Sequence, residues 1–231
     1  MNKNNVWFIT TKTNLHVGNE NTSSFGLIDL AVQRNATTGL PCINSSSLKG
    51  ALNEYASQFD DLDRIYIFGS DKKEKSKGSQ KGHFVFFDAD ILFLPKQSDK
   101  KLYELVTCKG VLDRFFNQVK LITGKDVSEE DLKKIFSYTT LETDEEFIEL
   151  CSDDNLPIIA RNVLENGESK NLWYEQVIPS ETVFYTFIDN DKVIDDDKGN
   201  KDLANKIKED IVQIGANATI GYGYCKFTNL K

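Results

Sequence analysis

The two ends of the chain carry mirrored patterns of apolar residues. Near the start, Val6–Thr11 is apolar, aromatic and β-branched, which is typical of a buried strand. A helical face follows it, formed by Leu48, Ala51, Leu52, Tyr55 and Phe59. Near the end, a predicted helix over Leu203–Ile214 precedes a glycine-rich turn and a final strand, Tyr222–Phe227. This order predicts an α+β fold in which helices lie on one face of an antiparallel sheet.

The middle of the chain supplies further elements of both kinds. Apolar and β-branched runs predict strands over Phe84–Leu94, Leu102–Val106 and Thr182–Ile188. Helices are predicted over Cys108–Ile122 and from the Ser128-x-x-Asp131 capping box to Tyr138. Two further strands, Ile158–Leu164 and Trp173–Ile178, are predicted as the arms of a hairpin with a polar tip at Glu165–Asn171.

Several classes of protein are excluded by composition. No apolar run approaches the roughly 18 residues of a membrane helix, and the polar start lacks the apolar region of a signal peptide. We therefore expect a cytoplasmic protein that does not meet a membrane. The four cysteines lie far apart and only two histidines occur, which argues against a zinc site and predicts buried, reduced thiols.

Charge is unevenly distributed along the chain. The net charge is −8, but residues 1–58 carry +1 and the remainder therefore carries −9. The stretch 141–154 is strongly acidic and contains neither lysine nor arginine. Because carboxylates repel phosphate, we expect any polyanion to meet the N-terminal part of the chain, away from this acidic stretch.

A long polar segment in the N-terminal part contains the best candidates for chemistry. Loops as long as Thr13–Ser47 are usually functional or disordered. Asp29 lies in it near Arg34, and a serine-rich helix start with Lys49 would form a ready site for an anion. Taken alone, Asp29 is more often a loop-capping residue, and His16 more often a structural histidine. The glycine-rich segment Ile214–Gly223 follows a helix and precedes a strand, so it is neither a P-loop nor a dinucleotide fingerprint.

Seven segments, in order along the chain, resemble one known family. Four of them are LHVG at 15–18, GLIDLAVQR at 26–34, TGLPCINSSSLKGAL at 38–52 and IGANATIGYG at 214–223. The other three are FVFFDADILFLP at 84–95, LVTCKGVL at 105–112 and LWYEQVIPSETVFY at 172–185. Together they resemble the RAMP superfamily of CRISPR proteins, and more narrowly the filament-forming backbone subunit of type III-B RNA-guided effector complexes.

The resemblance implies a fold and a set of partners. It implies a single domain over residues 1–231, with a ferredoxin-like, RNA-recognition-type core, a long N-terminal loop and a β-hairpin thumb inserted near 158–178. It also implies that several copies stack along one CRISPR guide RNA, together with complementary target RNA and other subunits of the complex. Members of the family that it resembles usually carry paired glycines where this chain has Gly215-Ala216, and most of them are longer.

The resemblance further assigns roles to individual residues. Asp29 corresponds to a loop aspartate needed for metal-dependent cleavage of target RNA, and is predicted to be catalytic, either as a ligand of Mg²⁺ or Mn²⁺ or as a base. His16 and Glu175 are predicted helpers. The predicted contacts to RNA are Arg34, Ser46, Ser47, Lys49, Gly215, Thr219, Gly221 and Gly223. Contacts of this kind would hold phosphates and read shape, because a guide must be accepted whatever its sequence.

Two other functions stay open at the level of sequence. The chain could be a scaffold that binds RNA without cleaving it. It could also be an endoribonuclease that processes CRISPR repeats, an activity that usually relies on acid–base chemistry without a metal. An assay of metal dependence separates these functions from metal-dependent cleavage of target RNA.

Overall fold

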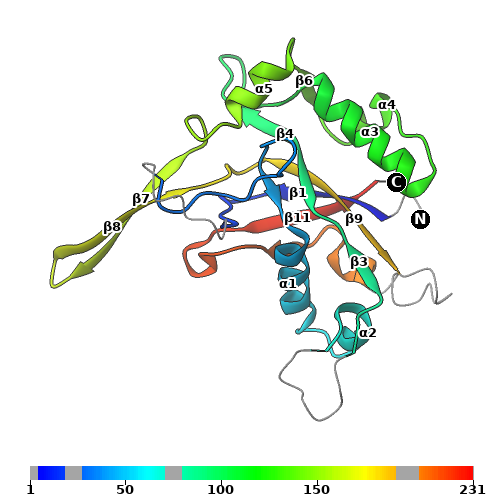
Figure 1. Cartoon of the computed structure of the whole chain (residues 1–231), viewed down its shortest axis with the longest axis horizontal. Helices are drawn as coiled ribbons and strands as arrows, with labels where there is room; N and C mark the ends of the chain where they lie inside the picture. Colours follow the sequence, from blue (N-terminus) through cyan, green and yellow to red (C-terminus); the bar gives the residue numbers. More distant parts are fainter. Residues whose placement is uncertain (1–4, 19–27, 71–79, 191–202, 231) are drawn as a thin grey trace.

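The computed structural model describes residues 5–18, 28–70, 80–190 and 203–230. Within these ranges, nine strands form one sheet and two more form a separate hairpin (Figure 1). Along the sheet the strands are ordered β10 (Ile211–Gln213), β11 (Tyr224–Asn229), β1 (Val6–Thr11), β9 (Val183–Asn190), β4 (Ala89–Lys96), β5 (Glu104–Thr107) and β6 (Tyr138–Thr140). β2 (Cys42–Ile43) pairs with β4, and β3 (Phe84–Phe86) pairs with β9. The mixed α+β class predicted from the sequence is confirmed.

The centre of the sheet follows a regular connectivity. β1 leads through helix α1 (Ser45–Ala56) to β4, which runs antiparallel to β9, and β9 leads through a helix at 203–207 to β11. β1 lies between β9 and β11 and is antiparallel to both. The four central strands follow the chain order strand–helix–strand–strand–helix–strand, and they lie side by side in the order β11-β1-β9-β4.

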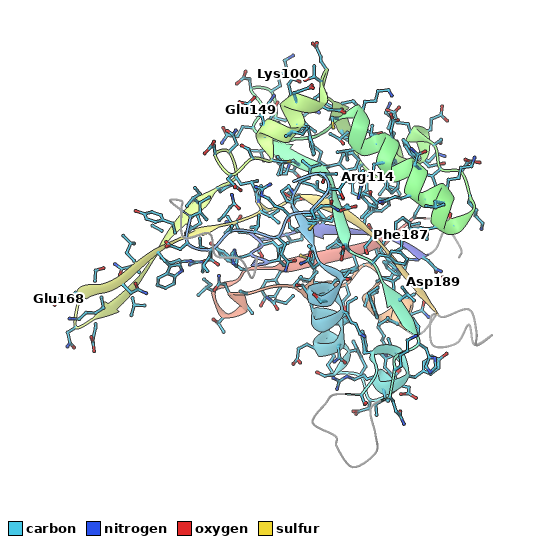
Figure 2. The ribbon with its side chains drawn as sticks, viewed as in Figure 1. Lys100, Arg114, Glu149, Glu168, Phe187 and Asp189 are labelled. Carbon is cyan, nitrogen blue, oxygen red and sulfur yellow. The ribbon has the colours of Figure 1, made fainter. Side chains whose placement is uncertain are left out.

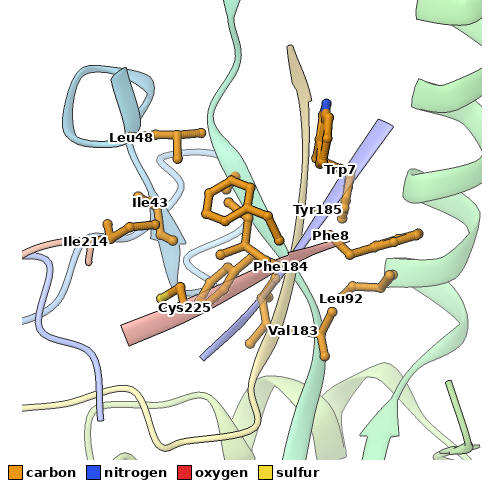
Figure 3. Packing of buried hydrophobic residues seen from close by; sticks show 14 of the residues in the cluster. Trp7, Phe8, Ile43, Leu48, Leu92, Val183, Phe184, Tyr185, Ile214 and Cys225 are labelled. Carbon is orange, nitrogen blue, oxygen red and sulfur yellow. The ribbon is translucent and has the colours of Figure 1, made fainter. Parts of the chain in front are cut away.

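Helices cover both faces of this sheet, so the expectation of helices on one face alone is wrong. Phe8 and Tyr185 are neighbours across β1 and β9, and both rings contact Phe115 of helix α3 (Lys109–Thr123). The next residue, Phe184, points to the opposite face because side chains alternate along a strand. Figure 3 shows Leu48 of α1 on that opposite side, with Cys225 and Ile214. Two apolar layers therefore sandwich the central strands.

The peripheral elements confirm some predictions and correct others. Ser128 does form a capping box with Asp131, but helix α4 (Glu129–Lys133) ends before Tyr138, which begins strand β6. Phe84–Leu94 divides into β3 and β4, and Leu102 is 96% exposed rather than part of a strand. The other short helices are α2 (Arg64–Phe68), α5 (Asp144–Leu150) and η2 (Ala218–Ile220).

The predicted helix over Leu203–Ile214 is wrong in its second half. The helix ends at residue 207, and Ile211–Gln213 forms β10, which pairs antiparallel with β11. Apolar residues at 203, 207, 211 and 214 fit a helical spacing, but β11 would otherwise be an open edge of the sheet within the described chain. Pairing with this edge satisfies backbone groups that a longer helix would have left unpaired.

Strands β7 (Ile158–Glu165) and β8 (Glu168–Gln176) form a long hairpin that stands away from the sheet (Figure 1). Its turn is Asn166-Gly167, and both residues have positive φ, at 53° and 86°. A two-residue turn of this type matches the twist of the strands, and Asn-Gly is its strongest sequence signal. The tip is therefore shorter than the predicted Glu165–Asn171, and Figure 2 shows Glu168 at its far end.

The cysteines follow their prediction. All four cysteines are free and buried, as expected. Burial raises the pKa of the Cys42, Cys151 and Cys225 thiols to about 12 and that of Cys108 to about 11. In the part of the chain that the structure describes, no helix is long and apolar enough to cross a membrane.

Candidate functional site

Asp29 lies at the base of the hairpin with its side chain exposed. Its carboxylate Oδ2 accepts a hydrogen bond of 2.7 Å from the backbone N–H of Tyr174, and its own N–H donates to the Tyr174 carbonyl. Leu30, beside it, forms a parallel bridge with Glu175. β8 therefore holds Asp29 in place, while the second carboxylate oxygen, Oδ1, takes part in none of the described hydrogen bonds.

His16 lies behind this position and is 4% exposed. Its Nδ1 is 2.8 Å from the carbonyl oxygen of Gln176, which can only accept a hydrogen bond. Nδ1 therefore carries the proton, and in the neutral ring Nε2 is the basic nitrogen. A Cβ built at Gly18 would lie 3.2 Å from Nε2, so this nitrogen of His16 faces Gly18.

Glu175 is 2% exposed, and both of its carboxylate oxygens are engaged. Oε2 accepts from Nε of Arg161 at 2.9 Å, and Oε1 accepts from the amide of Asn217. Oε1 is also 3.5 Å from Nδ1 of His16. The structure thus brings the two predicted helpers together, within the protein rather than on its surface.

The glycine-rich turn packs directly against His16. Ala216 donates its N–H to the His16 carbonyl at 2.9 Å, and a Cβ at Gly215 would overlap that same carbonyl oxygen. Gly215 also has φ of +79°, which L side chains rarely adopt. The close approach therefore requires glycine at position 215, whereas Ala216 is exposed and meets no such limit.

The remaining residues of the turn differ in exposure. Thr219, in the short helix η2, and Gly221 are exposed, while Gly223 is buried against the carbonyl of Ile214. Together with Gly215, which is also exposed, Thr219 and Gly221 are therefore the predicted contacts of the turn that an RNA strand can reach directly.

The start of helix α1 differs from its prediction. Its N-cap is Asn44 rather than a serine, and the Asn44 side chain makes no capping hydrogen bond. The carboxylate of Asp88 accepts from the N–H of Ser45 at 2.6 Å instead. Ser46 is exposed, and Lys49 is partly exposed with no ion pair among the described residues. A phosphate at this helix start would therefore meet Lys49 but compete with Asp88.

One glutamine connects these separate segments. Gln33 donates from Nε2 to the Gly18 carbonyl and to Ser47 Oγ, both at 3.0 Å, and its Oε1 accepts from the Asn44 N–H at 2.8 Å. Contacts thus run without interruption from the glycine-rich turn through residues 16–18 and 32–33 to the start of α1. The predicted RNA contacts, except Arg34, belong to this continuous region.

Arg34 is engaged within the protein. Its guanidinium donates to the carboxylate of Asp153 and to the carbonyls of Gly39 and Cys151, using four of its five N–H donors. Partial burial opposes ionisation of Asp153, but hydrogen bonds from Gln176 and Arg34 hold the pKa of that carboxyl below its usual range. Asp153, which belongs to the acidic stretch 141–154, therefore holds Arg34, one of the predicted RNA contacts, within the protein.

Three residues of this region were not anticipated. Asn217 lies within the glycine-rich segment and has φ of +65°, a conformation in which asparagine is enriched. An asparagine among glycines is therefore a signal in the sequence for a left-handed turn position. Arg161 and Asp88 carried no local signal, because each meets its partner only in the folded chain. Asp88 is 43 residues from Ser45 in sequence.

Metal-ligating side chains are sparse here. Among residues 5–18, 28–70, 80–190 and 203–230, no group of three or more His, Cys, Asp or Glu side chains is placed to hold an ion. A single exposed carboxylate such as Asp29 still suits Mg²⁺, which is commonly held by one or two carboxylates together with substrate phosphates and water. The donor set therefore fits an ion that a bound RNA would help to hold.

Comparison with known proteins gives consistent results. The family model of the RAMP superfamily matches residues 8–226. The chain is similar to the CRISPR system Cmr endoribonuclease Cmr4 of Pyrococcus furiosus, with 29% identity over an alignment 282 positions long that covers 94% of this chain and 92% of that protein.

Solved structures share the fold. A chain in the cryo-EM structure of the type III-B Cmr-beta bound to cognate target RNA matches with a TM-score of 0.74 and 19% identity, covering 96% of this chain and 95% of that one. The crystal structure of oligomeric Cmr4 from Pyrococcus furiosus matches with a TM-score of 0.69 and 25% identity, covering 96% of each chain.

Proposed function

Since the chain belongs to the RAMP superfamily, we propose that it is the guide-RNA-binding backbone subunit of a type III-B CRISPR effector complex, and that it cleaves target RNA complementary to the guide. The observation that carries this proposal is the similarity to an endoribonuclease over nearly the whole length of both proteins. The shared fold with a subunit of a complex bound to target RNA supports it. Further copies of the chain would stack along the same guide, and other subunits would join them.

Asp29 is the proposed catalytic residue. In RNA cleavage of this kind the 2′-oxygen forms a bond to the adjacent phosphorus while the bond from phosphorus to the 5′-oxygen breaks, leaving a 2′,3′-cyclic phosphate and a 5′-hydroxyl. The exposed Oδ1 would hold Mg²⁺ or Mn²⁺ or accept the proton of the 2′-hydroxyl, while the Tyr174 N–H keeps the carboxylate oriented through Oδ2. A bound divalent ion would stabilise the charge that develops on the phosphoryl oxygens.

The other candidates take different parts in this proposal. Guide phosphates would be contacted by the predicted positions that are at least partly exposed, which are Ser46, Ser47, Lys49, Gly215, Thr219 and Gly221. His16 and Glu175 would support the site from behind, because both are buried. Arg34 would act indirectly, by fixing the loop that contains it to Asp153.

The experiment is cleavage of a guide-complementary RNA by the assembled complex, with and without EDTA, beside a measurement of RNA binding. Asp29→Ala should abolish cleavage while guide and target binding persist. Asp99→Ala, which removes an exposed carboxylate from the loop between β4 and β5, is the matched control and should leave cleavage unchanged.

Each alternative has its own signature in this assay. Full cleavage by Asp29→Ala would overturn the assignment of Asp29, and equal loss of binding would make Asp29 a structural residue. No cleavage by the parent complex at any metal concentration would favour a scaffold. Metal-independent cleavage within CRISPR repeats would favour a processing endoribonuclease.

A further inference from the structure

The buried carboxylate of Glu175 is the point at which three separate parts of the chain meet. Arg161 reaches it from β7, Asn217 from the glycine-rich turn and His16 from the segment after β1. Glu175 itself belongs to β8. Its carboxylate therefore joins both strands of the hairpin to the glycine-rich turn. Burying a charge is costly unless it is paired and hydrogen-bonded, and here both oxygens have partners.

A second contact, between Arg161 and Tyr222, also joins the hairpin to the glycine-rich turn. The guanidinium carbon of Arg161 lies 4.8 Å from the centre of the Tyr222 ring, at the end of the glycine-rich turn. Arg161 therefore joins Glu175 on its own hairpin to an aromatic ring of the turn. Hairpin and turn are linked twice, once through Glu175 and Asn217 and once through Arg161 and Tyr222.

Among the described residues, the outer part of the hairpin makes no comparable contact with the rest of the protein. Val163 is 47% exposed and Leu172 is 53% exposed, and Figure 2 shows Glu168 at the tip, far from the body of the protein. Further contacts at the base, among the described residues, join Tyr174 to Asp29 and Leu30, and join Gln176 to His16, Leu30, Val32 and Asp153. The direction of the whole arm is thus decided by a few polar contacts near its root.

We propose that Glu175 is a positioning residue whose carboxylate clamps hairpin β7–β8 to the glycine-rich turn and so fixes the direction of the arm. This inference rests on the proposed function only in assigning guide RNA to the turn and target RNA to the arm. Guide RNA held at the turn would then determine where the arm meets the target. The clamp itself is a property of the protein without RNA.

The test measures the distance between spin labels on the arm and on the body, in the full chain without RNA. Labels at Asn171→Cys on β8 and Leu121→Cys on α3 occupy exposed positions, Leu121 being 83% exposed. The four native thiols are buried and have raised pKa values, so they should not compete for the label. Pulsed electron paramagnetic resonance then gives the distribution of distances.

The parent protein should show one narrow distance. Glu175→Gln keeps the shape but removes the charge and leaves a donor facing Arg161 or Asn217, so the distribution should broaden or shift. Asn217→Gly keeps the left-handed backbone and removes only the amide, so it should have a smaller effect in the same direction, and it keeps the test decisive if Glu175→Gln does not fold. Glu181→Gln, which breaks the exposed pair with Lys12, is the control and should match the parent.

Circular dichroism establishes which variants are folded before distances are compared. A distribution identical to the parent in the folded Glu175→Gln or Asn217→Gly protein would overturn the clamp. In the assembled complex, Glu175→Gln should spread cleavage over neighbouring phosphodiesters, whereas a purely structural loss would lower the yield at unchanged positions. Absence of cleavage by the parent complex would overturn the proposed function and leave the distance result standing.

Discussion

The central sheet and the hairpin are built from the same kind of strand but are held in place in opposite ways. In β1, Val6, Phe8 and Ile9 are fully buried, and many apolar contacts decide where the strand lies. The hairpin exposes most of its length, and a handful of polar contacts at its base decide its direction. Stability and the geometry of the candidate site are therefore controlled by different residues.

The largest effect on stability should come from the central sheet. Phe184 of β9 is fully buried between β1 and β4, and Phe184→Ala should lower the free energy of unfolding by about 3–5 kcal/mol. Val163→Ala on the exposed hairpin should change it by no more than about 0.5 kcal/mol. Urea denaturation followed by circular dichroism measures both. Equal losses would mean that the hairpin contributes to the core, contrary to its exposure.

A smaller effect is expected at the glycine-rich turn, where sheet and hairpin base meet. Gly215→Ala forces a Cβ against the His16 carbonyl at a positive φ and should destabilise the protein by about 1–3 kcal/mol. Gly221→Ala has a similar φ of +83° but open space around it, so it should cost only about 1 kcal/mol. Comparing the thermal unfolding of the two variants separates the cost of the clash with the His16 carbonyl from the cost of the positive φ. A larger loss for Gly221→Ala would contradict the packing of the turn on His16.

The smallest effects should appear at the start of α1, and in RNA affinity rather than stability. Lys49→Ala should weaken binding for all guide sequences alike and reduce the salt slope of binding by about one unit, since one phosphate contact is lost. Asp88→Asn keeps an acceptor for the Ser45 N–H but removes a negative charge, so it should strengthen binding modestly. Titrations at several salt concentrations measure both variants. A loss for Lys49→Ala that depends on guide sequence would show that Lys49 reads bases.

Local periodicity was sufficient for the elements that carry their own signal. Runs of apolar and β-branched residues determined β1 and most of β9, and helical spacing determined α1 and α3 to within a few residues. The capping box of Ser128 and Asp131 was found because its two partners are three residues apart. The signal of the Asn166-Gly167 turn is equally local, because its two residues are adjacent in the sequence. Patterns such as these depend only on neighbouring residues, so the sequence displays them directly.

Tertiary structure alone decided the features in which distant segments compete or meet. Residues 211–213 became a strand because β11 offered an edge to pair with, although their spacing suited a helix. Glu175 acquired its partners from positions 16, 161 and 217, and His16 meets Gln176 across 160 residues of sequence. Each of these contacts depends on how the sheet brings remote strands together. A single sequence shows which residues can form a charge pair or hydrogen bond, but the partner that each one obtains is decided only when the core has packed.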